Sequence, residues 1–178
     1  MDYNLLIGKY YKDNEKLKDI LLRHSRSVAD KALAIADAHP ELRLDREFLV
    51  EAAMVHDIGI FKTNAPDIEC FGSEPYIRHG VLGAEIMRAE GYPRHARVCE
   101  RHTGAGLSLK EIEDQALPLP HADLLPETLE EKVICYADKF FSKTKLDREK
   151  TLEQAERSVA KHGGEGLKRF REMEALFE

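Results

Sequence analysis

The chain has 178 residues, with 27 lysines and arginines against 33 aspartates and glutamates, which gives a formal net charge of −6. This length suits a single domain over 1–178, and the negative balance argues against a partner that is a nucleic acid polymer or an anionic membrane. No apolar run approaches the roughly 20 residues of a membrane span and the N-terminus lacks a basic signal region, so we expect a cytoplasmic protein.

Helical periodicity dominates the chain, and alternating strand-like runs are absent. Capping-box spacing marks helix starts at Thr128, with Glu131 three residues later, and at Thr151, followed by Gln154, while Gly91 marks a helix end. In chain order we predict helices at 3–12, 15–22, 24–38, 46–57, 76–90, 93–102, 109–115, 128–143, 149–161 and 165–177. The predicted fold class is all-α.

Two stretches resist a helical interpretation and are predicted to be ordered loops. The first spans 61–75, and the second spans 103–126, with prolines concentrated in its latter half. Each follows a histidine that could belong to a functional site, so each could form a wall or lid over that site. Simple connectors are an equally good explanation of both stretches.

The C-terminal segment, about 147–178, is dense in charge and predicts an amphipathic cover on a core of about 20–143. Its inward face is expected to carry the apolar residues Leu167, Phe170, Met173 and Phe177. A homodimer contact through this segment is left open. The three cysteines, Cys70, Cys99 and Cys135, are widely spaced and odd in number, so we expect them to be reduced and structural.

The adjacent residues His56 and Asp57 are the most informative pair in the sequence. An imidazole and a carboxylate are both good ligands for a divalent metal ion, and neighbours on a helix point about 100° apart. One ion can hardly be their only shared partner, which makes Asp57 a candidate bridge between two ions. Further histidines at His24, His79 and His102, and an aspartate at Asp138, complete a candidate metal site.

The apolar surroundings of Asp57 and Asp138 strengthen this interpretation. A buried carboxylate without a partner costs several kcal/mol unless a cation or a donor satisfies it. A buried salt bridge to lysine or arginine is the simpler explanation for either aspartate. Each histidine alone could also be a packing, surface or helix-capping residue, so the inference depends on the combination.

In order and in rough spacing, these six residues resemble the pattern of the HD-domain superfamily of metal-dependent phosphohydrolases. The segments closest to its six-ligand, two-metal subgroup, which includes diadenosine tetraphosphate hydrolases of the YqeK type, are His24-Ser25-x-x-Val28-Ala29, His56-Asp57-Ile58-Gly59, His79-Gly80, His102-Thr103-x-Gly and Tyr136-Ala137-Asp138-Lys139. The resemblance spans most of the chain. It implies an HD-domain helical bundle with additional C-terminal helices.

The resemblance implies two groups of ligands that share Asp57. One ion would be held by His24, His56, Asp57 and Asp138, and the second by Asp57, His79 and His102. Mixed nitrogen and oxygen ligation suits six-coordinate iron or manganese better than tetrahedral structural zinc. Iron is the first choice, and manganese, nickel, cobalt, magnesium and zinc are alternatives.

The expected chemistry is hydrolysis of a phosphate ester or anhydride, in a nucleotide or a dinucleoside polyphosphate. Two ions about 3.5–4 Å apart would make a bridging hydroxide available at neutral pH, with Asp57 as the shared catalytic carboxylate, and would clamp the phosphate oxygens. The cations nearest the ligands in sequence are Lys62, Arg78, Arg101, Lys139 and Lys143. We favour Arg101 and Lys139 for substrate binding, with Lys62 and Arg78 as further candidates.

The sequence departs from some relatives directly after the His-Asp motif. Those relatives carry a lysine where this chain has Ile60, and the next lysine is Lys62.

Two other functions fit the same ligands: a mixed-valence di-iron oxygenase on a similar scaffold, and a nucleotide-sensing domain with a structural metal. Dioxygen consumption or a failure to hydrolyse phosphate compounds would favour these alternatives.

Overall fold

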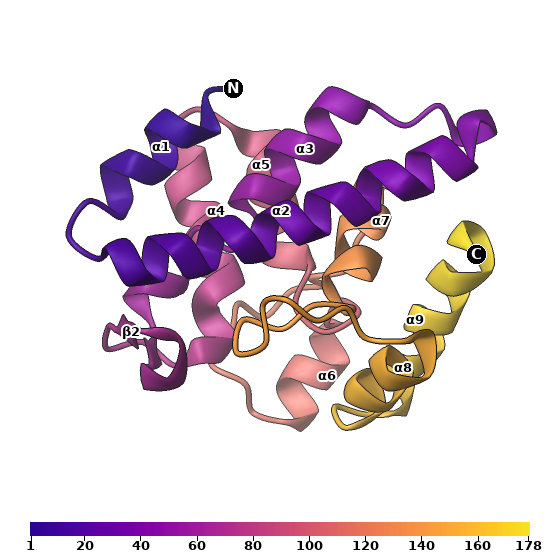
Figure 1. Ribbon diagram of the computed structural model, residues 1–178. Coiled ribbons are helices and arrows are strands. Elements are labelled where there is room, and N and C mark those ends of the chain that lie inside the picture. The colour runs from indigo at the N-terminus through magenta and orange to yellow at the C-terminus, as the bar shows by residue number, and fades with distance from the viewer.

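The computed structural model describes residues 1–178 and is built almost wholly from helices (Figure 1). The α-helices are α1 (Tyr3–Tyr10), α2 (Glu15–Ala38), α3 (Arg46–Val55), α4 (His79–Ala89), α5 (Pro93–Arg101), α6 (Leu109–Asp114), α7 (Leu129–Asp138), α8 (Leu152–Ala160) and α9 (Gly164–Phe177). Short 3-10 turns lie at Pro40–Leu42, Ile60–Lys62, Pro66–Ile68 and Tyr76–Arg78. The predicted all-α class is confirmed.

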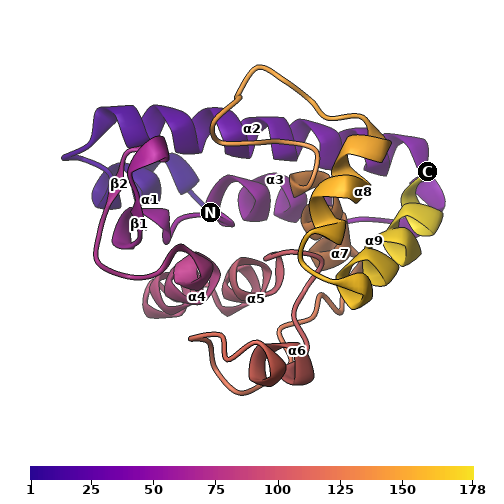
Figure 2. The same ribbon diagram turned by 90° about the horizontal axis from the view of Figure 1, so that it is seen from below.

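The long helix α2 crosses the molecule and packs against α3 (Figure 1). Helices α4 and α5 lie side by side, behind α2 in Figure 1 and below α2 and α3 in Figure 2. Two apolar clusters form the main core. The first joins the second half of α2 to α3, α7, α8 and α9, and the second joins α1 and the first half of α2 to α4 and α5. Their boundary falls in the middle of α2, between Leu21 of the second cluster and Val28 of the first.

The predicted break near residue 23 is wrong, because α2 is one continuous helix of 24 residues. Leu17, Leu21 and Val28 are all buried on one face of it, and no cap interrupts the stripe. The start of α2 is fixed by Asn14, whose side chain caps the helix by accepting a hydrogen bond from the amide of Leu17.

The prediction that a helix continues to residue 143 is also wrong, because α7 ends at Asp138. The amides of Lys139, Phe140 and Phe141 bond to carbonyls three residues back, and the side chain of Phe140 is buried in the first cluster. These tight turns reverse the chain after α7. The following loop, 139–151, therefore runs back toward the middle of α2 before it reaches α8 (orange in Figure 1).

The stretch predicted as the first loop contains a small hairpin. Strands β1 (Asn64–Ala65) and β2 (Cys70–Phe71) pair antiparallel, with Asn64 opposite Phe71 and Ala65 opposite Cys70. Strands of two residues are too short to show an alternating pattern, which is why the sequence did not indicate them.

Other local predictions agree with the structure. Thr128 and Thr151 both form the predicted capping boxes, and Gly91, with φ of +85°, follows the end of α4. Phe170, Met173 and Phe177 are buried under the C-terminal cover, and Leu167 packs against them in part. The three cysteines are buried and free. No helix combines the length and apolarity that a membrane crossing requires. The boundary between core and cover near residue 145 stays a prediction.

Gly59 lies where the chain leaves the His-Asp pair and passes the start of α4. A Cβ atom there would overlap the backbone of His79 and Gly83. We expect Gly59→Ala to lower the free energy of unfolding by roughly 1–3 kcal/mol, measured by urea denaturation. The control is Gly8→Ala in α1, where no atom lies within 4 Å of the new Cβ. Equal stability of the Gly59→Ala variant and the parent would contradict this account of close packing.

Candidate metal centre

The six residues singled out in the sequence meet at the boundary between the two apolar clusters. His24 lies in the middle of α2, while the others lie at helix ends: His56 and Asp57 directly after α3, His79 at the start of α4, His102 directly after α5 and Asp138 at the end of α7. Asp57 is 0% exposed, and the four histidines are at most 5% exposed. The side chain of Asp138 is the most exposed of the six, at 11%, and it lines an open cavity together with His79 and His102.

Asp57 is the centre of the arrangement, and its two oxygens face different partners. Its Oδ2 lies 3.2 Å from His24 Nε2 and 3.1 Å from His56 Nε2. Asp138 Oδ1 closes this first group, at 3.0 Å from His24 Nε2 and 3.4 Å from His56 Nε2. Four side chains thus present one donor atom each to a common point.

The other oxygen of Asp57 faces a second group. Its Oδ1 lies 3.4 Å from both His79 Nε2 and His102 Nε2, and these two nitrogens lie 3.0 Å from each other. The three ligand atoms are close enough to hold one ion together. Asp57 is therefore placed as a carboxylate shared by two groups, which matches the geometry predicted for it.

Backbone carbonyls fix the orientation of three of the imidazoles. Nδ1 of His56 donates to the Ala53 carbonyl at 2.6 Å, Nδ1 of His79 to the Tyr76 carbonyl at 2.7 Å, and Nδ1 of His102 to the Cys99 carbonyl at 2.7 Å. A carbonyl can only accept, so each Nδ1 carries a proton, and each ring presents a lone pair at Nε2 whenever that nitrogen is deprotonated. His79 and His102 then face each other lone pair to lone pair, an arrangement that a cation between them would stabilise.

The unpaired polar atoms test whether a metal fits here. His56 Nε2 and Asp57 Oδ1 are buried and make no hydrogen bond, while Asp57 Oδ2 makes no well-aligned hydrogen bond but forms an ion pair with Lys143 Nζ at 2.6 Å. Such atoms are costly in a core unless something satisfies them. Four imidazoles and two carboxylates that converge on two points satisfy the donor requirements of two divalent ions.

The pKa values support the same protonation states. Burial raises the pKa of the Asp57 carboxyl, but the positive charges of His56 and Lys143 outweigh it and hold this pKa well below its usual range. The pKa of Asp138 is also held well below its usual range, since Lys139 and His24 outweigh its burial. Burial lowers the pKa of His79 to about 3. Both carboxylates are thus ionised, and His79 is neutral, as a ligand must be.

His56 gives the centre a dependence on pH. Burial lowers its pKa, but Asp57 and Asp138 raise it to about 9, so the ring holds a proton at neutral pH when no cation is bound. A metal at Nε2 must displace that proton, and apparent metal affinity should rise with pH toward about 9. Calorimetric titration with Mn²⁺ in buffers of different ionisation enthalpy should show release of about one proton per chain at neutral pH. Binding without proton release would contradict this assignment.

Lys143 completes the centre, with its Nζ 2.6 Å from Asp57 Oδ2 and its side chain 12% exposed. This lysine was among the cations noted in the sequence but was not favoured there. The predicted helix to residue 143 would have carried it away from the ligands. Because α7 ends at Asp138, the loop instead returns Lys143 to the site.

A cavity of about 410 Å³ opens beside the two ligand groups and reaches His79, His102 and Asp138. Three lysines line it: Lys139, Lys143 and Lys150. Apolar walls come from Ile77, Leu107, Leu117, Phe141 and Val159, together with Tyr76. Residues of the predicted second loop, 103–126, thus form part of the wall, while Ala65, Pro66 and Ile68 of the first line a smaller adjoining pocket.

The predicted substrate-binding cations divide into two kinds. Lys139 lies at the cavity, where its Nζ donates to the His102 carbonyl at 3.0 Å and to Asp138 Oδ2 at 2.7 Å. Arg101 instead pairs with Glu127 at 2.7 Å, and Arg78 pairs with Glu74 at 2.9 Å. Neither arginine lines the cavity, and neither does Lys62. The prediction that these three residues contact the substrate is not favoured by their positions.

Two histidines outside the ligand set differ in position. His162, at the end of α8, lines the cavity, a placement that no sequence signal indicated. His121 is 74% exposed and lies away from the cavity.

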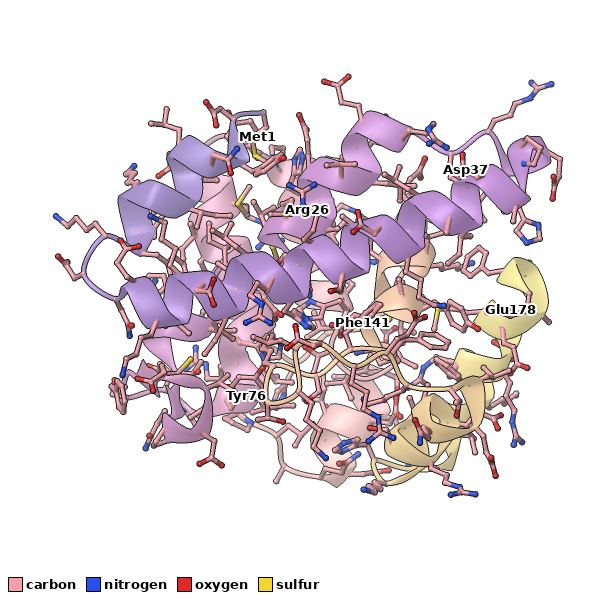
Figure 3. The ribbon with its side chains drawn as sticks, in the orientation of Figure 1. Met1, Arg26, Asp37, Tyr76, Phe141 and Glu178 are labelled. Atoms are coloured by element: carbon pink, nitrogen blue, oxygen red, sulfur yellow. The ribbon has the colours of Figure 1, made fainter.

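Tyr76 stacks on His79 with ring centroids 4.7 Å apart, and both Tyr76 and Phe141 lie below α2 in Figure 3.

Comparison with known proteins identifies relatives that share most of this chain. A tRNA (cytidine(56)-2'-O)-methyltransferase of Picrophilus torridus is 37% identical over 142 residues, which cover 79% of this chain and 36% of that protein. An enzyme of the same name from Thermoplasma volcanium is 33% identical over 153 residues, covering 80% of this chain and 40% of the other. The chain thus spans well under half the length of these two relatives.

A third relative matches along most of its own length. It is an uncharacterized protein of Methanocaldococcus jannaschii, 33% identical over 146 residues, which cover 80% of this chain and 79% of that protein. No solved structure matches the chain. The sequence pattern of the HD domain matches residues 21–142, a segment that contains all six residues of the centre. The chain therefore belongs to the HD-domain family.

Proposed function

We propose that the chain is a metal-dependent phosphohydrolase that cleaves a phosphate ester or anhydride bond of a nucleotide. The observation that carries the proposal is the placement of Asp57, whose two oxygens face separate ligand groups at the end of a cavity lined by three lysines. Membership in the HD-domain family supports the same class of reaction. The resemblance to the YqeK-type subgroup stays a prediction.

The two ligand groups would hold two divalent ions, with Asp57 shared between them. His24, His56 and Asp138 would complete the first set, and His79 and His102 the second. Bound divalent ions would supply an acidified water as nucleophile and Lewis-acid polarisation of the phosphate oxygens. Iron is our first choice, because mixed imidazole and carboxylate ligation suits it.

The lysines of the cavity would bind and orient the phosphate group. Lys139 and Lys143 each lie within 2.7 Å of a ligand carboxylate, so their ammonium groups are held at the rim of the centre. There they can donate to phosphate oxygens and stabilise charge that develops in the transition state.

The apolar wall of the cavity supports a nucleotide as the substrate class. Tyr76 and Phe141 offer aromatic surface, and Leu107 and Leu117 offer aliphatic surface, for a base. Two relatives bear the names of enzymes that modify tRNA. Methyl transfer itself is not proposed here, because most of the length of those two relatives has no counterpart in this chain.

A panel of nucleotides and dinucleoside polyphosphates tests the proposal. The chain, purified without chelator and loaded with iron or manganese, should release phosphate or a mononucleotide equally well with and without dioxygen. Dioxygen consumption with an organic substrate would instead indicate an oxygenase. A fully loaded centre that hydrolyses no member of the panel would contradict the proposal and favour a binding domain.

Lys143 and Lys62 give a matched comparison within the proposed function. We expect Lys143→Met to lower the rate of phosphate release by roughly 10- to 1000-fold, because it removes a donor at the rim of the centre. Lys62→Met should have little effect, since Lys62 does not line the cavity. The measurement is kcat and KM for both variants at equal metal content. Equal losses in the two variants, or a loss only in Lys62→Met, would contradict this assignment.

A further inference from the structure

A second pocket, here named the basic groove, lies beside the cavity of the metal centre. It has a volume of about 270 Å³ and is lined by Ser142, Lys145, Arg148, Lys150, Gln154, Arg157, Ser158 and Lys161. Five of these eight residues are cations, and none is a carboxylate. This concentration of positive charge contrasts with the net charge of −6 for the whole chain.

The basic groove is continuous with the cavity. Lys150 and Ser158 line both, so they form a shared edge between the two spaces. Lys150 is half-buried, and its Nζ donates to the Lys139 carbonyl at 3.1 Å, which holds the ammonium group at this edge. A ligand whose phosphate lies at the metal centre can therefore extend past Lys150 into the groove.

Four of the five cations of the groove make no ion pair, while Arg157 pairs with Glu153 within α8. For the cations in loop 139–151, the way this loop lies on α2 is the reason. The acidic residues of the loop turn toward the helix, where Asp147 pairs with Arg23 and Glu149 pairs with Lys31 (loop in orange, Figure 1). Lys145 and Arg148, from the same loop, make no ion pair, and Lys161 at the end of α8 makes none either. The loop thus separates its charges, with the negative ones neutralised and the positive ones presented to the groove.

We infer that the basic groove binds a second phosphate group of the substrate, so that the preferred substrate is a small nucleotide with more than one phosphate. This inference rests on the proposed function, which places the first phosphate at the metal centre. Unpaired ammonium and guanidinium groups are the side chains that recognise phosphate. A nucleoside monophosphate would leave these cations without a partner.

The surroundings of the groove favour a small nucleotide over a nucleic acid polymer. Asp147 and Glu149 of the same loop pair with α2, Glu153 pairs with Arg157, and the chain as a whole is acidic. A polymer would need positive charge that continues along its backbone. The positive charge here is concentrated in the groove and the adjoining cavity.

The test compares three nucleotides: adenosine 5′-monophosphate, adenosine 5′-triphosphate and adenosine 3′,5′-bisphosphate. Affinity is read as KM where the metal-loaded protein hydrolyses the compound, and as Kd from calorimetry where it does not. The groove variant carries Lys145→Ala together with Arg148→Ala, and both of these residues are exposed in the parent. The matched control is Lys12→Ala with Lys16→Ala, two exposed lysines outside every pocket described here.

At least one of the two compounds with several phosphates should bind better than the monophosphate, and the groove variant should lose roughly fivefold to tenfold of that preference. The control variant should keep it. Equal affinity of the parent for all three nucleotides would overturn the inference, as would a short oligonucleotide without terminal phosphate that binds more tightly than any of them. A preference that is seen by calorimetry without any hydrolysis would support the groove while refuting the proposed reaction.

Discussion

Replacing Asp57 by asparagine is expected to remove both metal ions and to lower phosphate release by at least about a thousandfold. The reason is the position of this carboxylate, which is the only side chain shared by the two ligand groups. Its Oδ2 faces His24 and His56, and its Oδ1 faces His79 and His102. An amide offers one weak oxygen ligand and no negative charge, so neither group would remain complete.

The measurement is metal content by elemental analysis together with phosphate release from the best nucleotide of the panel. The control is Asp114→Asn, since Asp114 is an exposed aspartate that pairs only with Lys110. Circular dichroism of each variant checks that the fold is kept. If the Asp57→Asn variant holds as much metal as the parent and hydrolyses as fast, the shared carboxylate has no role in the centre.

His79→Ala is expected to reduce the metal content from about two ions to about one per chain, with phosphate release lowered at least a hundredfold or so. His79 and His102 belong only to the second group, so their loss leaves His24, His56 and Asp138 in place with Asp57. The first ion should therefore remain. The rate should still fall, because a single ion cannot polarise both the nucleophile and the phosphate.

Elemental analysis of His79→Ala beside His121→Ala tests this difference. His121 is exposed and distant from the cavity, so its variant should keep both ions and full activity. A His79→Ala variant that loses both ions would show that the two groups do not bind metal separately. One that keeps both would show that His79 is not a ligand.

The six candidate ligands singled out in the sequence lie together in the structure, whereas only Lys139 of the four predicted substrate-binding cations lies at the cavity. Five of the six candidate ligands lie at helix ends, and their order along the chain survives small errors in helix boundaries. The positions of the candidate substrate-binding cations depend on the path that the chain takes after each helix ends. Arg101 was favoured because it adjoins His102, yet it points to Glu127 and the Leu125 carbonyl.

Lys143 and Lys150 illustrate the part that could not be predicted. Both lie in loop 139–151, whose path is set by the burial of Phe140 and by ion pairs of Asp147 and Glu149 to α2. Such long-range contacts leave no periodic signal in the sequence. His162 reaches the cavity for a similar reason, because the packing of α8 against α9 decides where the end of α8 lies.

The metal content of the parent chain tests the central claim of a two-ion centre most directly. The protein is purified without chelator, and its metals are measured by elemental analysis against protein concentration. We predict about two divalent ions per chain, with iron or manganese foremost. A value below about 0.2 ions per chain that does not rise when iron, manganese or another divalent metal is added would contradict the two-ion centre.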